Sequence, residues 1–294
     1  MQKTVLVAGA SGYLGRYVAL EFKKRGYKVR AFVRDPEKLK HPGPSLEPAI
    51  FDMVDEVFTG DATKPETLAG LCEGVDLVFS SMGLTRPDPK LTCEQVDHLG
   101  NLHILDIAWP VGVKKFVYVS VFRADDMMQS DVVRAHERFV YNLKDSSLEY
   151  AIIRPNAYFS DMGQFLKLAR KGHMFWLGDG HNRINPIHGA DLAVVCADAA
   201  EGTAKEVNVG GPEMFTYRSL FELAFKTVGK KPRITFIPLW IGEVALGIIK
   251  LFSRKLAGMA SFLVLANKME NDAPAYGSRK LKDYFMELER PPKR

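Results

Sequence analysis

Three evenly spaced glycines stand close to the start of the chain, within the run VLVAGASGYLGR at residues 5–16. An apolar segment precedes them and a helical pattern follows. Gly9 permits a tight turn off a strand, Gly12 lets backbone approach a pyrophosphate, and Gly15 lets a helix pack closely on a sheet. The first helical turn then offers free N–H groups and a partial positive charge to phosphates. The run predicts a dinucleotide site, with a glycine-rich structural turn as the alternative. The residues expected at this site are Gly9, Ser11, Gly12, Tyr13, Leu14, Gly15 and Arg16.

The choice of dinucleotide depends on the residue that ends the second strand, roughly 20 positions after the glycines. An acid there selects the 2′-hydroxyl of NAD, but this chain has Arg34. A guanidinium pairs bidentately with a 2′-phosphate, and a charge-assisted hydrogen bond contributes about 1.5–3 kcal/mol, roughly a 10- to 100-fold preference. We therefore expect NADP(H), with Arg16 as a second contact and Lys38 as a weaker one. The alternative is a solvated arginine at a strand end. Asp35 comes one residue later and is expected to point away.

Two further segments follow predicted strands at the same edge of the sheet. Asp61 follows the third strand, where its carboxylate can accept from the adenine amino group or cap a helix together with Thr63. After the fourth strand, small residues permit close approach of the backbone to the sugars of the cofactor. These residues are Ser80, Ser81, Met82 and Gly83.

Short apolar runs alternate with helical patterns through the first half of the chain. Continuous apolar strands are typical of a parallel sheet covered on both faces. The alternation predicts a Rossmann-type α/β fold with a doubly wound parallel sheet. The predicted strands are Thr4–Ala8, Lys28–Val33, Glu56–Phe58, Val75–Ser80, Phe116–Ser120 and Tyr150–Ile153. The predicted helices are Leu14–Arg25, Pro65–Leu71, Gln95–Ala108 and Val132–Leu143.

After Pro155 the rhythm changes. We expect residues 1–155 to form the NAD(P)-binding domain, with return segments near 184–210, and residues 156–294 to form a smaller α/β substrate-binding lobe. The predicted elements after residue 155 are helices at 161–170 and 217–228 and strands at 174–177, 206–209 and 233–237, followed by a last segment at 278–288. The residues that leave the last strand enter the crevice where ligands bind, and their aromatic rings suit a flat or apolar substrate. These expected pocket residues are Asn156, Tyr158 and Phe159.

Composition excludes several classes of protein. The 294 residues are 47% hydrophobic and 26% charged, which is typical of a globular chain. The net charge of +5 includes no block of Lys and Arg, so we expect no nucleic-acid partner. Cys72, Cys93 and Cys196 show no metal-ligand spacing, so we expect no metal and a reducing, cytoplasmic location. A strand-like run begins at Thr4, and no apolar run reaches the roughly 20 residues of a membrane span.

Two apolar helical stretches, Phe236–Phe252 and Met259–Ala266, lie near the end of the chain. They fit the core of the second lobe. A substrate lid or a peripheral membrane contact through residues 236–266 is the other interpretation, since Lys250, Arg254 and Lys255 form a small basic cluster.

The motifs together resemble those of the atypical short-chain dehydrogenase/reductase superfamily, and within it the NmrA-like, NAD(P)H-binding branch. The segments that carry this resemblance are residues 9–15, 60–61, 80–83, 117–120 and 153–155. The second half resembles divinyl chlorophyllide 8-vinyl reductases at residues 150–159, 177–180, 185–193, 209–212 and 274–277. Relatives in this superfamily also include respiratory complex I accessory subunits and plastid assembly factors that bind the nucleotide.

The resemblance also implies a catalytic arrangement, from which this chain departs. The superfamily uses a Ser followed by Tyr-x-x-x-Lys on a later helix. Ser120 matches the Ser, but on the helix no Tyr precedes a Lys by four residues. The vinyl reductases carry Arg-Ala-Lys there, where this chain has Arg134, Ala135 and His136. A histidine titrates at about pH 6.5, so His136 is expected as proton donor or ribose ligand, and Arg134 as a cofactor contact. The alternative is that His136 has no chemical role.

Two functional hypotheses follow from these observations. The first is an NADPH-dependent oxidoreductase that transfers hydride to a C=C or C=O bond of a hydrophobic or conjugated small molecule, in the manner of a vinyl reductase. The second is an NADP(H)-binding sensor or assembly protein without turnover, which the missing Tyr-x-x-x-Lys favours.

Overall fold

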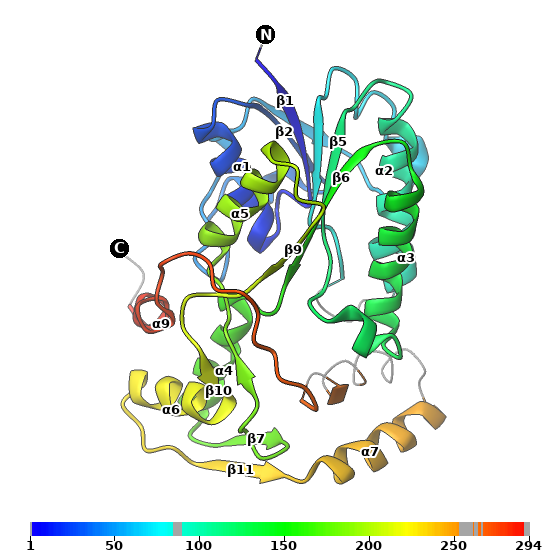
Figure 1. Cartoon of the computed structure of the whole chain (residues 1–294). Helices are drawn as coiled ribbons and strands as arrows, with labels where there is room; N and C mark the ends of the chain where they lie inside the picture. Colours follow the sequence, from blue (N-terminus) through cyan, green and yellow to red (C-terminus); the bar gives the residue numbers. More distant parts are fainter. Residues whose placement is uncertain (1, 85–89, 253–260, 262–263, 266, 291–294) are drawn as a thin grey trace.

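The computed structural model describes residues 2–84, 90–252, 261, 264–265 and 267–290. Its centre is a seven-stranded sheet in the order β3-β2-β1-β4-β5-β6-β9, in which all neighbouring strands are parallel (Figure 1). The predicted Rossmann-type α/β fold is confirmed. The strands are β1 (Thr4–Ala8), β2 (Lys28–Val33), β3 (Glu56–Thr59), β4 (Leu77–Ser80), β5 (Lys115–Val119), β6 (Glu149–Pro155) and β9 (Glu206–Val209).

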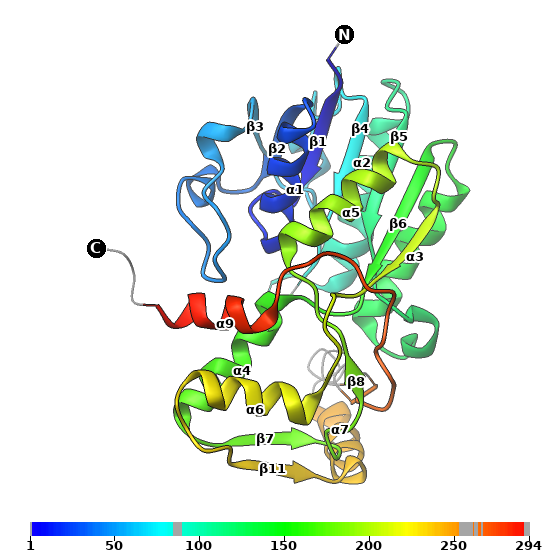
Figure 2. The same cartoon turned by 60° about the vertical axis from the view of Figure 1, so that its left-hand side comes forward.

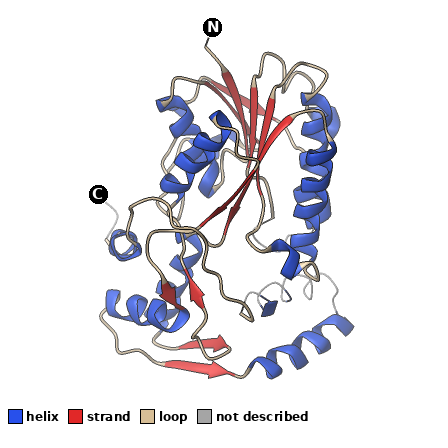
Figure 3. Cartoon of the chain, in the orientation of Figure 1, coloured by secondary structure: helices blue, strands red, loops and turns tan. Residues whose placement is uncertain are grey.

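Helices cover both faces of this sheet, as Figure 3 shows. On one face lie α1 (Tyr13–Lys24) and α5 (Gly189–Glu201), and on the other α2 (Gly100–Ala108) and α3 (Asp131–Asp145). Alternate residues of β1 supply the two cores, because strand side chains point to opposite faces. Val5 and Val7 belong to the core under α1 and α5, whereas Leu6 belongs to the core under α2 and α3.

The strand order reverses between β1 and β4, and this reversal creates the crevice where such folds bind ligands. The two strands run side by side to their carboxyl ends, with Ala8 opposite Ser80. Just beyond, the Ser81 N–H donates to the Ala8 carbonyl at 3.2 Å. The fold therefore brings the glycine turn after β1 next to the small residues after β4.

The second lobe lies below the carboxyl edge of the sheet (Figure 2). Its own hydrophobic core contains Leu166, Phe221, Phe225 and Phe285. Strand β7 pairs in parallel with β11, and β8 pairs antiparallel with β10. The chain returns from this lobe to the large sheet through α5 and β9 before it enters the lobe again. The elements of the lobe are α4 (Phe159–Lys171), β7 (Met174–Leu177), β8 (Arg183–Ile184), β10 (Phe215–Thr216), α6 (Tyr217–Thr227), β11 (Ile234–Ile237), α7 (Leu239–Phe252) and α9 (Leu281–Glu289).

Some predicted elements differ from those observed. The helix predicted over 65–71 is only a 3₁₀ turn at Pro65–Thr67, because Gly70 and Gly74 adopt φ of +78° and +69° and divert the chain. The helix predicted over 95–108 divides into a π-helical segment, Glu94–Leu99, and α2. Of the apolar stretch at 259–266, residues 259–260, 262–263 and 266 lie outside the described residues. In the described part of the chain, no helix is both long enough and apolar enough to cross a membrane.

Candidate cofactor site

A cavity of about 770 Å³ lies at the strand-order reversal, between the carboxyl edge of the sheet and the second lobe. Most residues predicted to bind the cofactor line it, together with one predicted substrate residue. The predicted residues in its wall are Gly9, Ser11, Gly12, Tyr13, Leu14, Arg34, Asp61, Ser81, Met82, Gly83 and Tyr158. The sequence patterns after β1, β2, β3 and β4 thus converge on one cavity.

The glycine turn forms a close backbone cradle on this cavity. Gly9 has φ of +83°, and its carbonyl accepts from the Gly12 N–H at 2.9 Å. A Cβ on Gly15 would lie 2.8 Å from the Gly9 carbonyl carbon and 2.9 Å from the Ala10 Cα, so only glycine allows α1 to pack this closely. Gly12 caps α1 without a side-chain acceptor, which leaves the first N–H groups of the helix available to phosphate oxygens. The cradle fits a pyrophosphate.

Arg34 lies in the cavity wall with its side chain exposed. Within the described residues, no carboxylate lies within ion-pair distance of its guanidinium, although its charge acts on the nearby Asp61. Asp35, the next residue, accepts from the Glu37 N–H at 3.1 Å and caps a 3₁₀ turn away from the cavity. The expectation that Asp35 points away is therefore confirmed, and Arg34 is the residue at this strand end that can meet a 2′-phosphate.

Asp61 both caps a turn and lines the cavity. Its Oδ1 accepts from the Thr63 N–H at 3.0 Å and from the Thr63 hydroxyl at 2.8 Å. Burial alone would raise the pKa of Asp61, but the hydrogen bonds from Thr63 and the charge of Arg34 outweigh burial and lower it. The carboxylate is therefore held ionised, as an acceptor for an amino group requires.

Arg16 has a different role from the predicted phosphate contact. It is buried, and its guanidinium donates to the carbonyls of Ser11, Lys38, His41 and Pro48 at 2.5–3.2 Å. Four acceptors therefore occupy the side chain, which ties the loop after β2 to the start of α1. Arg16 does not line the cavity but holds in place the segments that do. Lys38 takes part in these contacts only through its backbone carbonyl.

Ser80 also stands behind the wall. Its buried hydroxyl donates to Asn101 Oδ1 at 2.5 Å and accepts from the Met82 N–H at 3.3 Å. The side chain therefore fixes the turn that presents Ser81, Met82 and Gly83 to the cavity, instead of contacting a ligand itself.

The predicted catalytic Ser120 belongs to a buried charge network. Its hydroxyl donates to Glu137 Oε1 at 2.6 Å. Arg154 makes a two-pronged ion pair with the same carboxylate at 2.7 and 3.0 Å, and its Nε donates to Glu206 at 3.1 Å. Ser120 is only 4% exposed and does not line the cavity. In this structure Ser120, Glu137 and Arg154 fasten α3 to β5 and β6.

Both ring nitrogens of His136 have protein partners. Its Nδ1 lies 2.6 Å from the Tyr118 hydroxyl and its Nε2 lies 3.1 Å from Asp97 Oδ1. Asp97 is fully buried and accepts from the Leu84 N–H at 3.2–3.3 Å. A Cβ on Gly83 would lie 3.5 Å from the imidazole and 2.9 Å from Asp97. His136 is therefore next to the cavity wall and supports the Gly83–Leu84 backbone through Asp97.

Arg134 lies outside the cavity wall, contrary to the predicted cofactor contact. Its guanidinium donates to the carbonyls of Met128 and Gln129 at 3.3 Å and forms an ion pair with Asp131. The side chain is exposed and binds back onto the start of its own helix, α3.

The predicted substrate residues separate in the structure. Tyr158 lines the cavity, but Phe159 is 1% exposed and packs in the core of the second lobe. The Asn156 amide donates to Asn185 Oδ1 and to the Asn271 carbonyl, each at 2.5 Å, so it joins three segments of the lobe. The helix turn after Tyr158 rotates Phe159 inward, which is why consecutive residues do not share one wall.

Helix α4 contributes a wall of the cavity that was not predicted from the sequence. Ser160, Gln164 and Lys167 line the cavity at i, i+4 and i+7, together with Asp161. Asp161 is exposed to the cavity, and desolvation by the protein atoms around the cavity wall raises its pKa to about 6. The signal for this wall is the polar face of a helix that starts directly after the last strand of the first half. The loop after β2 adds Ser45 and Glu47.

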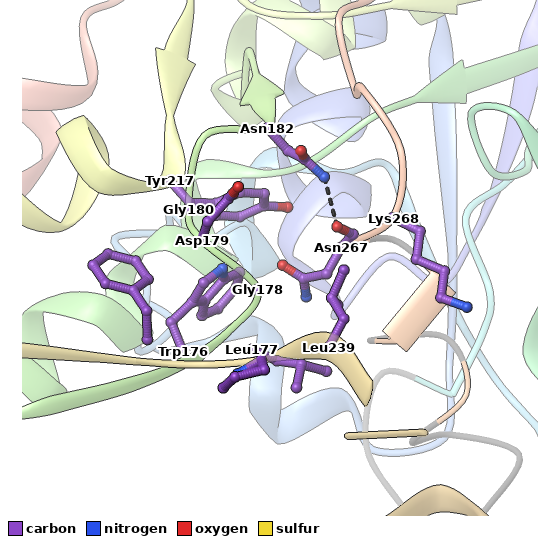
Figure 4. A pocket seen from close by; sticks show the side chains of 12 residues that line it. Trp176, Leu177, Gly178, Asp179, Gly180, Asn182, Tyr217, Leu239, Asn267 and Lys268 are labelled. Atoms are coloured by element: carbon purple, nitrogen blue, oxygen red, sulfur yellow. Dashed lines mark hydrogen bonds between the residues drawn. The ribbon is translucent and has the colours of Figure 1, made fainter. Parts of the chain in front are cut away.

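A second cavity, of about 430 Å³, lies within the second lobe and shares no lining residue with the first. Figure 4 shows Trp176, Tyr217 and Leu239 around it, with the Asn182 amide donating to the Asn267 carbonyl at 2.5 Å across one side. Phe236 completes a largely apolar wall. The first cavity is lined by the glycine turn and by charged side chains such as Arg34 and Asp61, whereas the second has three aromatic rings in its wall.

His188 has a structural role. Its Nδ1 accepts from the Ala190 N–H at 3.0 Å and caps α5. Burial and the charge of Arg279 lower the pKa of His188 to about 4, so the ring is neutral at physiological pH. The ring packs edge-on against Tyr17 and Phe159 and joins the two lobes.

Comparison with known sequences agrees with this site. A family model described as NAD(P)H-binding matches residues 9–203. The divinyl chlorophyllide a 8-vinyl-reductase of Oryza sativa subsp. indica is 28% identical over a gapped alignment of 320 positions, which covers 97% of this chain and 78% of that protein. The photosystem II assembly factor Ycf39 of Guillardia theta is 27% identical over 243 residues, which cover 80% of this chain and 74% of that protein.

Solved structures show the same fold. The triphenylmethane reductase of Citrobacter sp., complexed with NADP(H), superposes with a TM-score of 0.73 at 20% identity, covering 97% of this chain and 99% of that one. The NADPH-dependent quinone oxidoreductase QOR2 of Escherichia coli, complexed with NADPH, gives 0.72 at 21% identity with the same coverage. In both cases the similarity in fold extends over nearly the whole length of the two chains.

Proposed function

Because the chain belongs to the NAD(P)H-binding family, we propose that it is an NADPH-dependent reductase acting on an apolar or conjugated small molecule. The observation that carries this proposal is the single cavity that joins the glycine cradle, Arg34 and the turn at Ser81–Gly83. The vinyl reductase relatives, whose name states a reduction of a C=C bond, support this class of reaction.

The fit of the cavity to the cofactor rests on this chain's own residues. The cradle accommodates a pyrophosphate only because Gly9, Gly12 and Gly15 lack side chains. Arg34 would supply a cation for the 2′-phosphate, since no carboxylate of the described residues forms an ion pair with it, and Asp61 would supply an ionised acceptor for the adenine. When bound, NADPH supplies a hydride, and a hydride and a proton together saturate the double bond while NADP⁺ forms.

The protein's share of the reaction is to orient the cofactor and the substrate. The Leu84 N–H donates to Asp97, and His136 contacts the same carboxylate, so these contacts fix the backbone of the cavity wall at Gly83. Protein partners hold the Ser120 hydroxyl and both His136 nitrogens, so we assign the proton to water. In this proposal His136 is a positioning residue.

The test is consumption of NADPH, followed by the absorbance of the reduced nicotinamide with a panel of quinones and divinyl tetrapyrroles. We expect acceptor-dependent loss of absorbance in the wild-type protein and at least a tenfold slower rate in Gly83→Ala, whose Cβ would crowd Asp97. A wild-type protein that binds NADPH and reduces none of these acceptors would contradict the reductase.

A second function has one specific observation in its favour. The groups that match the superfamily's catalytic positions are engaged in structural contacts: Ser120 with Glu137, and His136 with Tyr118 and Asp97. An NADP(H)-binding assembly or sensor protein needs the cradle but no proton donor, and a photosystem II assembly factor is among the relatives. Binding of NADPH without turnover, together with a partner whose retention depends on NADPH, would favour this function.

A further inference from the structure

Helix α7 presents an apolar face to solvent. None of its residues with described side chains is buried, and six large apolar residues are exposed by 40–85%. At 3.6 residues per turn these six positions fall within an arc of about 120°, so they form one continuous stripe. The stripe consists of Trp240, Ile241, Val244, Ile248, Leu251 and Phe252.

The opposite side of α7 attaches the helix to the second lobe. A Cβ on Gly242 would lie 2.5 Å from Leu177 Cδ1, so the start of α7 rests directly on β7. Leu239, Leu246 and Ile249 are half-buried on this inner side. Contacts with the lobe therefore fix the orientation of the helix, and the exposed stripe is its outer face.

Helix α7 lies at one end of the molecule. Figures 1 and 2, related by a turn about the vertical axis, both show α7, β7 and β11 at the lower end, on the side away from the large sheet. Phe175 of β7 is 65% exposed there, and His173 stacks on its ring with centroids 4.6 Å apart. We call this surface, formed by the α7 stripe and Phe175, the lower face.

Basic residues lie at the end of the β7–β11 pair that is away from α7. Lys171 ends α4, and Lys230, Lys231 and Arg233 lie in the segment that leads into β11; all four are exposed. Glu243, an acid on α7 itself, forms an ion pair with Lys268, so its charge is compensated locally. The charge at this end therefore complements an anionic surface.

We propose that the lower face docks on an anionic lipid membrane, with the α7 stripe inserted among the acyl chains and the basic residues at the headgroups. A stripe of large apolar side chains with a Trp at one end and basic neighbours is the pattern of a helix lying in a bilayer interface. This docking is independent of the reductase chemistry. Leu239, on the inner side of α7, lines the second cavity, so that cavity lies on the side of the helix opposite the stripe (Figure 4).

The experiment is co-flotation of the full-length protein with vesicles of phosphatidylcholine alone and of equal parts phosphatidylcholine and phosphatidylglycerol. We expect the wild-type protein to float with the mixed vesicles, and at least tenfold less with the neutral ones. The double variant Val244→Glu/Ile248→Glu places two carboxylates in the stripe and is expected to lose at least tenfold in vesicle binding.

A matched control carries the same number of new charges elsewhere. Trp109 and Tyr141, 59% and 70% exposed on the large domain, are changed together to Glu and are expected to leave flotation unchanged. Far-ultraviolet circular dichroism and NADPH affinity report that both double variants are folded. Trp240 fluorescence, isolated by comparison with Trp240→Phe, is expected to shift to the blue on vesicle binding.

Three results would overturn the proposal. One is flotation of Val244→Glu/Ile248→Glu equal to that of the wild-type protein, and another is no flotation of the wild-type protein with either vesicle. The third is a wild-type dimer in gel filtration that becomes monomeric in this variant and does not bind vesicles, which would assign the stripe to a second copy of the chain.

Discussion

We expect the charge of Arg34 to determine the preference for NADPH over NADH. We predict that Arg34→Gln weakens NADPH binding by about tenfold and leaves NADH binding within about twofold of the wild-type value. The side chain lies in the cavity wall at the end of β2, where only the phosphorylated ribose of NADPH offers it an anion.

The magnitude follows from the exposure of the side chain. A hydrogen bond between charged groups contributes about 1.5–3 kcal/mol, and about 1.4 kcal/mol changes an affinity tenfold. Because Arg34 is exposed, solvent screens the pair and the lower end of that range applies. Isothermal calorimetry with each nucleotide, at low and at high salt, measures the effect, and the NADPH advantage is expected to shrink as salt rises.

Lys38→Gln is the control. It also removes one positive charge, four residues after Arg34, but the Lys38 side chain does not line the cavity. It is expected to change NADPH affinity by less than about twofold. The reasoning is refuted if Arg34→Gln weakens NADH and NADPH equally, or if Lys38→Gln has the same effect as Arg34→Gln.

Three further predictions concern packing and protonation. Gly15→Ala, whose Cβ would lie within 3 Å of the Gly9 and Ala10 backbone, is expected to lower NADPH affinity by at least about tenfold in calorimetry. Asp161→Asn removes a carboxyl whose pKa burial raises to about 6, so NADPH is expected to bind about threefold to tenfold more tightly above pH 6, with little change below about pH 5. His188→Asn keeps an acceptor for the Ala190 N–H but cannot titrate. Since burial lowers the pKa of His188 to about 4, its neutral form stabilises the fold above about pH 6.5, and that stabilisation decreases as pH falls toward 4. The free energy of unfolding of the wild-type protein, measured by thermal unfolding, should therefore decrease by up to about 2 kcal/mol between about pH 7 and pH 5. That of His188→Asn should decrease by less over the same range.

Each of these predictions has a result that contradicts it. Gly247→Ala, in α7 with open space around the added methyl, serves as the matched control for Gly15→Ala, and equal losses in both would remove the packing argument. An unchanged pH profile of NADPH affinity in Asp161→Asn would mean that the carboxyl lies away from the cofactor. A parallel pH dependence of unfolding in the wild type and His188→Asn would exclude His188 as the titrating group.

Local sequence patterns are sufficient to predict the framework of the large domain. Apolar runs bounded by turn residues predict β1 and β2 with the limits observed, because both strands are buried on both faces of a parallel sheet. The segment after β3 could not be predicted in the same way. Its apolar residues suggest helix spacing, but Gly70 and Gly74 take positive φ and the chain crosses to β4 with only a 3₁₀ turn.

The residues of the candidate site also fall into a group that local sequence patterns predict and a group that they do not. The glycine turn, Arg34 and Asp61 follow directly from the strands that precede them, so their position in the cavity wall was predictable. The roles of Arg16 and His136 depend on partners distant in the sequence: the carbonyls of residues 38, 41 and 48 for the former, and Asp97 and Tyr118 for the latter. No local pattern encodes those contacts.

A crystal structure of the NADPH complex tests the central claim most directly. We predict that the pyrophosphate binds the N–H groups at the start of α1, that the 2′-phosphate lies within hydrogen-bond distance of Arg34, and that the nicotinamide lies beside Ser81–Gly83. A complex in which the 2′-phosphate contacts other residues, or in which NADPH occupies another part of the protein, would contradict it.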